Sequence, residues 1–301
     1  MYSRYNVISL IKGVYTVISD FNELKIKIVA DSSCDIKSVD GIDFTSVPLT
    51  LSAGDREFID DETLNVREML DFLEKHNGRS RTACPAVEKW MSAFEGADIV
   101  YAVTMTSNLS GTYNSACAAR DLFLQSHPNV KIHIFDSLST GPEMRLLIEK
   151  LREAIDNKVS FENTIELGQK YLDSVKLFFA LGSLHNLAQN GRVKKSVAAV
   201  IEKLGVRMIG MASEIGTIKV VGACKGAKKV PATIIKKLKS VKYNGKKVSI
   251  CHVDNYPLAD ELRREIKKEY PEAEVLVYPA GGLCSFYAER GGMIIGCECE
   301  E

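Results

Sequence analysis

Apolar residues recur along the chain in two patterns, short β-branched runs and longer segments with helical spacing. The short runs predict strands at 25–30, 44–51, 56–59, 99–103, 130–135, 175–181, 206–211, 217–221, 247–252, 274–277 and 293–296. The longer segments predict helices at 63–75, 85–94, 112–124, 144–155, 161–174, 184–189, 196–204, 230–238 and 257–269. Segment 81–85 is predicted as a turn. Strands that alternate with helices are typical of an α/β protein with a parallel sheet.

The 301 residues, 46% of them hydrophobic, are enough for two domains with separate cores. The polar segment 157–160 separates two predicted helices and marks the boundary, so the predicted domains are 25–158 and 159–301. Residues 1–24 form an extension in which apolar residues recur at roughly helical spacing. Lys12 interrupts this run, which is too short to span a bilayer, so we expect an added amphipathic helix or a start assigned too early.

The most informative stretch runs from a buried strand at 99–103, through a loop rich in hydroxyl groups, into the helix at 112–124. The loop contains Ser107, Ser110 and Gly111. Backbone amides at a helix N-terminus are free to donate hydrogen bonds, and the helix dipole favours an anion there. The stretch therefore predicts a site for a phosphate or carboxylate, although a Ser110 that only caps its own helix explains the same pattern.

The order of strand, polar loop and helix occurs three times in the predicted parallel sheet. Asp31 and Ser32 follow the first strand, and Ser137 and Ser139 follow the strand at 130–135. Ligands of open α/β sheets bind beyond the carboxyl ends of the strands, so the three loops are expected to converge on one pocket. The alternative is that each hydroxyl caps its own helix and that Asp31 holds its own loop.

Charge and cysteine usage narrow the functional classes. The chain carries 39 basic and 39 acidic side chains, which gives no bulk attraction to nucleic acid. Ten lysines and no acidic residue lie between 219 and 247, which predicts a solvated face or a docking surface for an acidic protein. Eight scattered cysteines without a C-x-x-C pair favour reduced thiols in a cytoplasmic protein over a zinc site or disulfides.

Several motifs of catalytic chemistry are missing from the sequence. It has no G-x-S-x-G elbow, no Walker A loop and no G-x-G-x-x-G fingerprint, and its five histidines lack metal-ligand spacing. The predicted site has hydroxyls and amides but no evident general base. We therefore expect a non-catalytic protein that holds an anion without a metal or cofactor.

Five stretches together resemble the DegV family of bacterial lipid-binding proteins. They are IVADSSCD at 28–35, TACP at 82–85, TSNLSGTYNSA at 106–116, FDSLSTG at 135–141 and the segment 184–193 that ends in GRV. The resemblance covers about residues 25–297 in the right order, and its S-x-L-S-G-T element is fairly specific. It implies two α/β domains, a three-layer domain with a parallel sheet and then a domain with a mixed sheet, and a fatty acid between them.

The resemblance also implies roles for individual residues. In the family the acyl chain is buried, and hydroxyls at the positions of Thr82 and Ser110 hold the carboxylate, with the Gly111 amide nearby. Arg192 and Tyr287 fall on further motif positions around the pocket. Such proteins resemble the fatty-acid-binding subunit of bacterial fatty acid kinase, which presents the carboxylate to a separate ATP-using subunit. The implied ligand is a long-chain acid such as palmitate or oleate, and transient membrane contact stays open.

Two positions depart from the family pattern. Tyr287 stands where the family usually has a histidine, and Cys224 and Lys225 stand where it tends to carry an arginine. A phenol donates a hydrogen bond but cannot become an imidazolium, and a lysine lacks the bidentate geometry of arginine. These departures affect the expected presentation of the fatty acid to a kinase subunit more than the expected binding of the acyl chain. Two alternatives remain, a phosphoryl- or acyl-transfer enzyme that uses the same anion site, and a lipid-dependent sensor or interaction protein.

Overall fold

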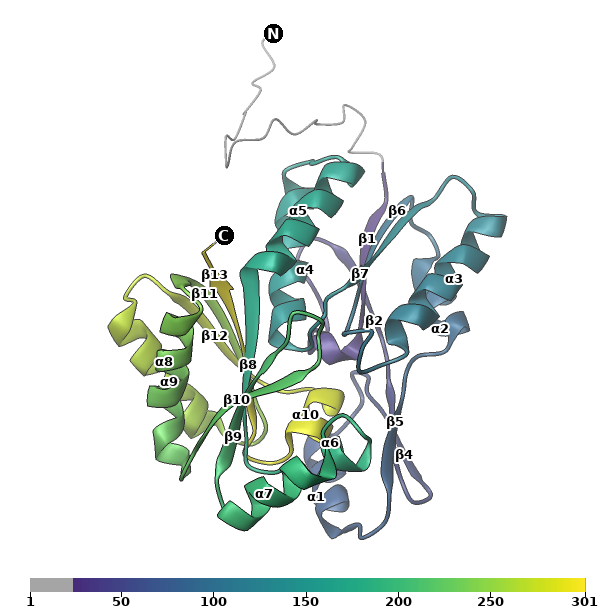
Figure 1. Cartoon of the computed structure of the whole chain (residues 1–301). Coiled ribbons are helices and arrows are strands. Elements are labelled where there is room, and N and C mark those ends of the chain that lie inside the picture. Colours follow the sequence, from purple (N-terminus) through teal and green to yellow (C-terminus); the bar gives the residue numbers. More distant parts are fainter. Residues whose placement is uncertain (1–23, 301) are drawn as a thin grey trace.

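The structure is a computed structural model that describes residues 24–300, so the helix expected within residues 1–24 falls outside it apart from Leu24. The described chain forms two α/β halves that lie side by side (Figure 1). The first half has a parallel sheet between two layers of helices, and the second has a mixed sheet. This arrangement confirms the predicted fold class.

The first half is built on a four-stranded parallel sheet in the order β2-β1-β6-β7. Its strands are β1 (Ile26–Asp31), β2 (Asp43–Val47), β6 (Ile99–Thr104) and β7 (Lys131–Asp136). One face is covered by α2 (Val87–Phe94) and α3 (Thr112–Ser126), and the other by α4 (Pro142–Asp156) and α5 (Phe161–Ser174). Every residue of β6 is buried, which explains its continuous apolar run.

A small antiparallel sheet in the order β4-β3-β5 extends the first half next to α1 (Val66–Lys75). Its strands are β3 (Thr50–Ala53), β4 (Arg56–Ile59) and β5 (Ser80–Ala83). The single strand predicted at 44–51 is wrong, because the chain breaks at Pro48, which has no amide to donate, and forms β2 and β3. The turn predicted at 81–85 is also wrong, because Thr82 pairs with Leu51 in the β5–β3 ladder.

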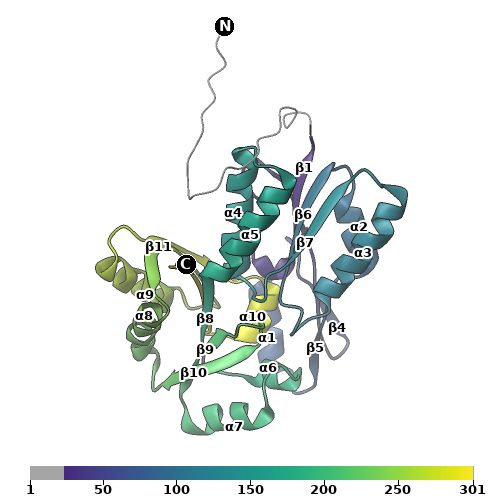
Figure 2. The ribbon, with the colours of Figure 1, turned by 45° about the horizontal axis from the view of Figure 1, so that its top comes forward.

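The second half is built on a six-stranded mixed sheet in the order β10-β9-β8-β13-β11-β12, in which only β11 and β12 pair in parallel. Its strands are β8 (Val175–Leu181), β9 (Arg207–Ala212), β10 (Ile218–Cys224), β11 (Tyr243–His252), β12 (Glu274–Pro279) and β13 (Met293–Cys299). Its helices are α6 (His185–Gln189), α7 (Lys195–Leu204), α8 (Val230–Ser240), α9 (Tyr256–Glu269) and α10 (Gly282–Ala288). Helices α8 and α9 cover the outer face, whereas α10, which was not predicted, lies between the halves (Figure 2).

The largest hydrophobic core belongs to both halves. It contains Ile28 and Met144 from the first half and Phe179 and Ile294 from the second. Helix α4 packs against β6 of the parallel sheet and also against β8, β11 and β13 of the mixed sheet. Helix α5 packs on β7, and the chain enters the mixed sheet only at Val175. The predicted division between residues 158 and 159 stays a prediction.

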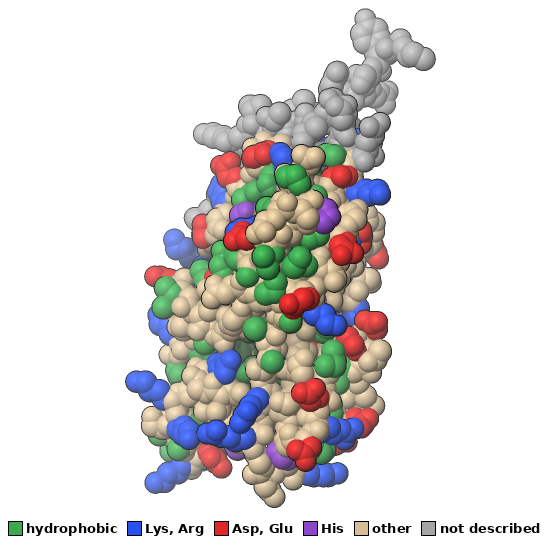
Figure 3. Space-filling model, turned by 90° about the vertical axis from the view of Figure 1, so that its right-hand side faces the viewer, with side chains coloured by type: hydrophobic (Ala, Val, Ile, Leu, Met, Phe, Trp, Pro, Cys, Tyr) green, Lys and Arg blue, Asp and Glu red, His purple; other side chains and the backbone are tan. Residues whose placement is uncertain are grey.

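The outer surface shows no single dominant charge on the face at the right of Figure 1. Acidic and basic side chains are interspersed over that face, with hydrophobic side chains among them (Figure 3). Within residues 24–300, no helix combines the length and the apolar character needed to cross a membrane. The eight cysteines are free thiols, and no three His, Cys, Asp or Glu side chains of the described part are grouped to hold a metal ion.

Candidate functional site

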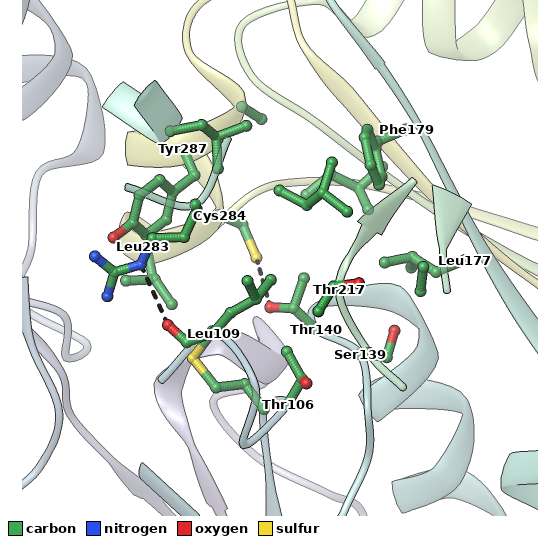
Figure 4. Close-up of a pocket in the computed structure, with 18 of the residues that line it drawn as sticks. Thr106, Leu109, Ser139, Thr140, Leu177, Phe179, Thr217, Leu283, Cys284 and Tyr287 are labelled. Atoms are coloured by element: carbon green, nitrogen blue, oxygen red, sulfur yellow. Dashed lines mark hydrogen bonds between the residues drawn. The ribbon is translucent and has the colours of Figure 1, made fainter. Parts of the chain in front are cut away.

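An apolar cavity lies between the two halves, beyond the carboxyl ends of β6 and β7. Loops of the first half at 105–109 and 138–140 form one wall, and the mixed sheet and α10 form the others (Figure 4). The space free of protein atoms among these residues is about 740 Å³, a figure that includes space open to solvent. Its apolar lining includes Leu109, Leu177, Phe179, Leu181, Leu283 and Ile294. Such a cavity suits a long apolar ligand.

One end of the cavity is polar because Tyr287 and Arg192 line it. The Tyr287 hydroxyl lies 2.8 Å from Oγ1 of Thr82, and the Arg192 guanidinium carbon lies 5.9 Å from the Tyr287 ring centre. Nε of Arg192 donates a hydrogen bond to the Leu109 carbonyl at 3.2 Å. Burial raises the pKa of Tyr287 against the opposing effects of Thr82 and Arg192, so this phenol is neutral near pH 7.

The predicted anion loop reaches the same end of the cavity through Leu109, which precedes Ser110. Gly111 is exposed at the start of α3, and a Cβ built there would lie 3.3 Å from Sγ of Cys84. The segment 82–85 therefore packs against the loop. Oγ of Ser110 lies 2.8 Å from Oγ1 of Thr112 and also accepts the Thr112 amide at 3.3 Å. The structure thus brings together the segments that carry Thr82, Ser110 and Gly111, although none of these three residues is among those that line the cavity.

Ser139 lines the cavity at a different place, on the side of Leu177 (Figure 4). Its hydroxyl donates to Oε2 of Glu143 at 2.5 Å, and its carbonyl accepts the Thr106 amide at 2.9 Å. Burial raises the pKa of Glu143 to about 7, although the Ser139 hydrogen bond opposes the shift. Ser139 therefore joins the loops after β6 and β7 and forms part of the wall.

Asp31 and Ser32 do not line this cavity. Oδ1 of Asp31 accepts both the amide and the hydroxyl of Ser33, and Oδ2 accepts the Met105 amide at 2.7 Å. Burial raises the pKa of Asp31 to about 6 in spite of these hydrogen bonds. The Ser32 hydroxyl donates to Asp60 at 2.8 Å, and Ser32 faces a second, more polar cavity. These contacts match the loop-holding role that was the alternative for Asp31.

Ser107 and Ser137 are likewise not among the residues that line the apolar cavity. The Ser107 amide donates to Oδ1 of Asp136 at 3.1 Å, which ties the loop after β6 to the end of β7. The Ser137 amide donates to the Thr104 carbonyl at 3.1 Å. Of the predicted pocket residues, the structure therefore brings Ser139, Arg192 and Tyr287 to the cavity and uses the others in the loops around it.

Sequence reasoning missed α10, which carries Tyr287. Carboxylates of the first half hold the N-terminus of this helix, since Asp60 accepts the amides of Gly282 at 2.7 Å and Leu283 at 2.9 Å. Asp35 accepts the Gly281 amide at 2.9 Å. An apolar segment flanked by two pairs of glycines was a signal for the helix. No pattern near α10 in the sequence indicated that Asp35 and Asp60 accept its amides, because both residues lie more than 200 positions away.

The comparisons with known proteins identify the family. The model described as "Uncharacterised protein, DegV family" matches residues 25–298. The chain belongs to the DegV family. A DegV domain-containing protein of Streptococcus pneumoniae strain R6 is 38% identical over 278 residues, which cover 91% of this chain and 99% of that protein. The resemblance that the motifs indicated is confirmed.

Solved DegV structures share the fold. A DegV family protein from Eubacterium eligens loaded with heptadecanoic acid is 48% identical, with a TM-score of 0.89 and coverage of 91% of this chain and 100% of that chain. The Streptococcus pneumoniae Fatty Acid Kinase (Fak) B3 protein loaded with linoleic acid is 38% identical, with a TM-score of 0.90 and coverage of 92% and 100%. Both DegV neighbours confirm the α/β fold, whereas the assignment of Thr82, Ser110 and Gly111 to a carboxylate stays a prediction.

Proposed function

We propose that this DegV protein binds one long-chain fatty acid in the cavity between its halves. The observation that carries the proposal is a largely apolar cavity with Arg192 and Tyr287 at one end. Two similar structures support it, because the Eubacterium eligens protein is loaded with heptadecanoic acid and the Fak B3 protein with linoleic acid. The ligand here is an acid such as palmitate or oleate, and no cofactor is needed.

Burial of the acyl chain supplies the affinity. About 15 methylenes at ~0.8 kcal/mol each give a gross stabilisation of about 12 kcal/mol, before the costs of association. The carboxylate adds little to this sum, because it must lose water to enter the site. Its role is to fix which end of the ligand lies at Tyr287.

The head group is held by hydroxyl and amide donors. The Thr82 and Ser110 hydroxyls donate to the carboxylate, and the Gly111 amide at the start of α3 adds a third donor in the field of the helix dipole. Arg192 lies close enough to supply positive charge. Tyr287 stays neutral and positions Thr82 through their mutual hydrogen bond.

The protein is a carrier and not a catalyst in this proposal. Its head-group end holds donors and a cation, and Tyr287 stands in place of a histidine that would accept a proton near pH 7. We propose that it presents the acid to a separate ATP-using kinase subunit. The similarity to the Fak B3 protein of a fatty acid kinase supports such a partner.

Mass spectrometry of lipid extracted from purified protein tests the proposal. We expect a long-chain fatty acid at up to one per chain, and Ser110→Ala should weaken palmitate binding by about 1.5–3 kcal/mol, the range for a hydrogen bond to a charged group. Thr82→Val should do the same, and the double variant should lose less than the sum, since both hydroxyls hold one carboxylate. Ser126→Ala, at the far end of α3, is the matched control. Protein that is empty and takes up neither palmitate nor oleate would refute the carrier role.

A further inference from the structure

The Phe179 ring lies on bare backbone of the neighbouring strand. Phe179 of β8 is directly opposite Gly210 of β9 in the antiparallel ladder. A Cβ built on Gly210 would lie 2.1 Å from Cε2 and 2.4 Å from Cζ of the Phe179 ring, far inside any normal contact. Gly210 does not have the positive φ that would require glycine, so its missing side chain serves only to make room for the ring.

The same ring forms part of the cavity wall on the side away from the head-group end. Figure 4 shows Tyr287 on one side of the cavity and Phe179 and Leu177 on the other. Phe179 is paired with Ile294 of β13, which also lines the cavity. The position of the ring between β9 and the cavity therefore decides how much space remains at this side.

We propose that Phe179, placed by Gly210, is a specificity-determining residue that sets the length of acyl chain the cavity accepts. The inference rests on the proposed fatty-acid binding and extends it to the choice of substrate. A chain whose carboxylate is fixed near Tyr287 extends toward Phe179 and Leu177. Any methylene that cannot find apolar surroundings there loses about 0.8 kcal/mol, which is about fourfold in affinity.

Two substitutions at this one contact should act in opposite directions. Gly210→Ala places a methyl group where the ring now lies, so the ring must move from β9 toward the cavity and shorten it. Phe179→Leu removes the ring and lengthens the cavity. The double variant Gly210→Ala/Phe179→Leu has room for the new methyl group, so its preference should return toward that of the Phe179→Leu protein.

The test offers each protein an equal mixture of lauric, myristic, palmitic, stearic and arachidic acids and measures the bound acids by mass spectrometry. For Gly210→Ala we expect the ratio of shorter to longer acids to rise by about fourfold or more, and for Phe179→Leu to fall by a similar factor. Phe178→Leu is the matched control, because Phe178 is buried in the separate core on the other face of the mixed sheet. It should lose stability without changing the ratio.

The outcomes separate this inference from the proposal beneath it. If no variant and no unmodified protein binds any acid, fatty-acid binding itself is refuted. If all bind and the ratios for Gly210→Ala and Phe179→Leu equal that of Phe178→Leu, Phe179 does not select chain length. If Gly210→Ala fails to fold, Phe179→Leu compared with Phe178→Leu still decides the matter.

Discussion

At the scale of single residues, the loops around the cavity depend on buried carboxyl groups. Burial raises the pKa of Asp31 to about 6 and that of Glu143 to about 7. Burial and the nearby Asp60 raise the pKa of Asp35 to about 7. Each of these groups accepts hydrogen bonds that join separate segments, and these bonds favour the charged carboxylate. Burial outweighs them, so the folded chain keeps a proton that the unfolded chain would release at lower pH.

Glu143→Gln is expected to change how stability depends on pH. The folded pKa of Glu143 lies above its ordinary value of 4.5, so the folded state binds the proton more tightly than the unfolded chain does. The raised pKa of Glu143 therefore adds its full contribution to the free energy of unfolding below about pH 4.5. This contribution is lost as the pH rises toward about 7, and the loss reaches about 3 kcal/mol by pH 8. The glutamine variant cannot lose a proton and should lack this decline.

Urea unfolding between about pH 5 and pH 8 measures the effect. The stability of the unmodified protein should fall relative to Glu143→Gln across that range. Glu166→Gln, which alters an exposed residue of α5, should follow the unmodified protein. Parallel curves for the unmodified protein and Glu143→Gln would show that Glu143 is charged in both states.

At the scale of elements, α10 depends on contacts outside itself. A helix of seven residues is too short to be stable alone in water. Its cap residue, Gly281, provides no side-chain hydrogen bond, and Asp60 of the first half accepts two of its amides instead. The first half thus holds the helix that places Tyr287 in the cavity.

Asp60→Ala is expected to loosen α10 more than the rest of the protein. Removal of the carboxylate leaves the buried amides of Gly282 and Leu283 without acceptors, which costs about 1–3 kcal/mol for each group. Hydrogen exchange measured by mass spectrometry should become faster in peptides that cover α10 than in those that cover α9. Glu62→Ala, an exposed acid two residues away, is the control. Unchanged exchange in α10 would mean that its packing alone holds it.

At the scale of the whole molecule, the two halves share their largest core. Residues of both sheets pack in it, and α4 contacts both sheets. The cavity lies within this shared region, so a bound acid would contact both halves at once. Separate unfolding of one half would expose the apolar surface of the other, which disfavours such an intermediate.

The chain is therefore expected to unfold in a single transition. Trp90 is the only tryptophan; it belongs to α2 and is fully buried in the core between this helix, α3 and the parallel sheet. Far-ultraviolet circular dichroism, by contrast, reports on both halves. Both signals should have the same midpoint in urea, and added palmitate should raise both midpoints together. Two separated midpoints would show that the halves unfold independently.

The sequence by itself determined the features that depend on neighbouring residues. The apolar pattern predicted both ends of β8 and of α5 correctly. Strand β8 is an almost continuous buried run, and α5 buries one stripe of its side chains. Local patterns likewise predicted the alternation of strands and helices, and the loops with hydroxyl side chains after β1, β6 and β7. The parallel sheet follows from them, whereas the anion site before α3 stays a prediction.

Only the tertiary structure decided which loop residues reach the cavity. The Thr82–Tyr287 contact joins residues 205 positions apart, and the strand that carries Thr82 forms because β3 pairs with it. Ser137 and Ser139 are similar in sequence context, yet Ser137 serves its loop and Ser139 lines the cavity. Burial and hydrogen bonding between distant segments decide such differences, because every buried polar group must find a partner wherever the fold places it.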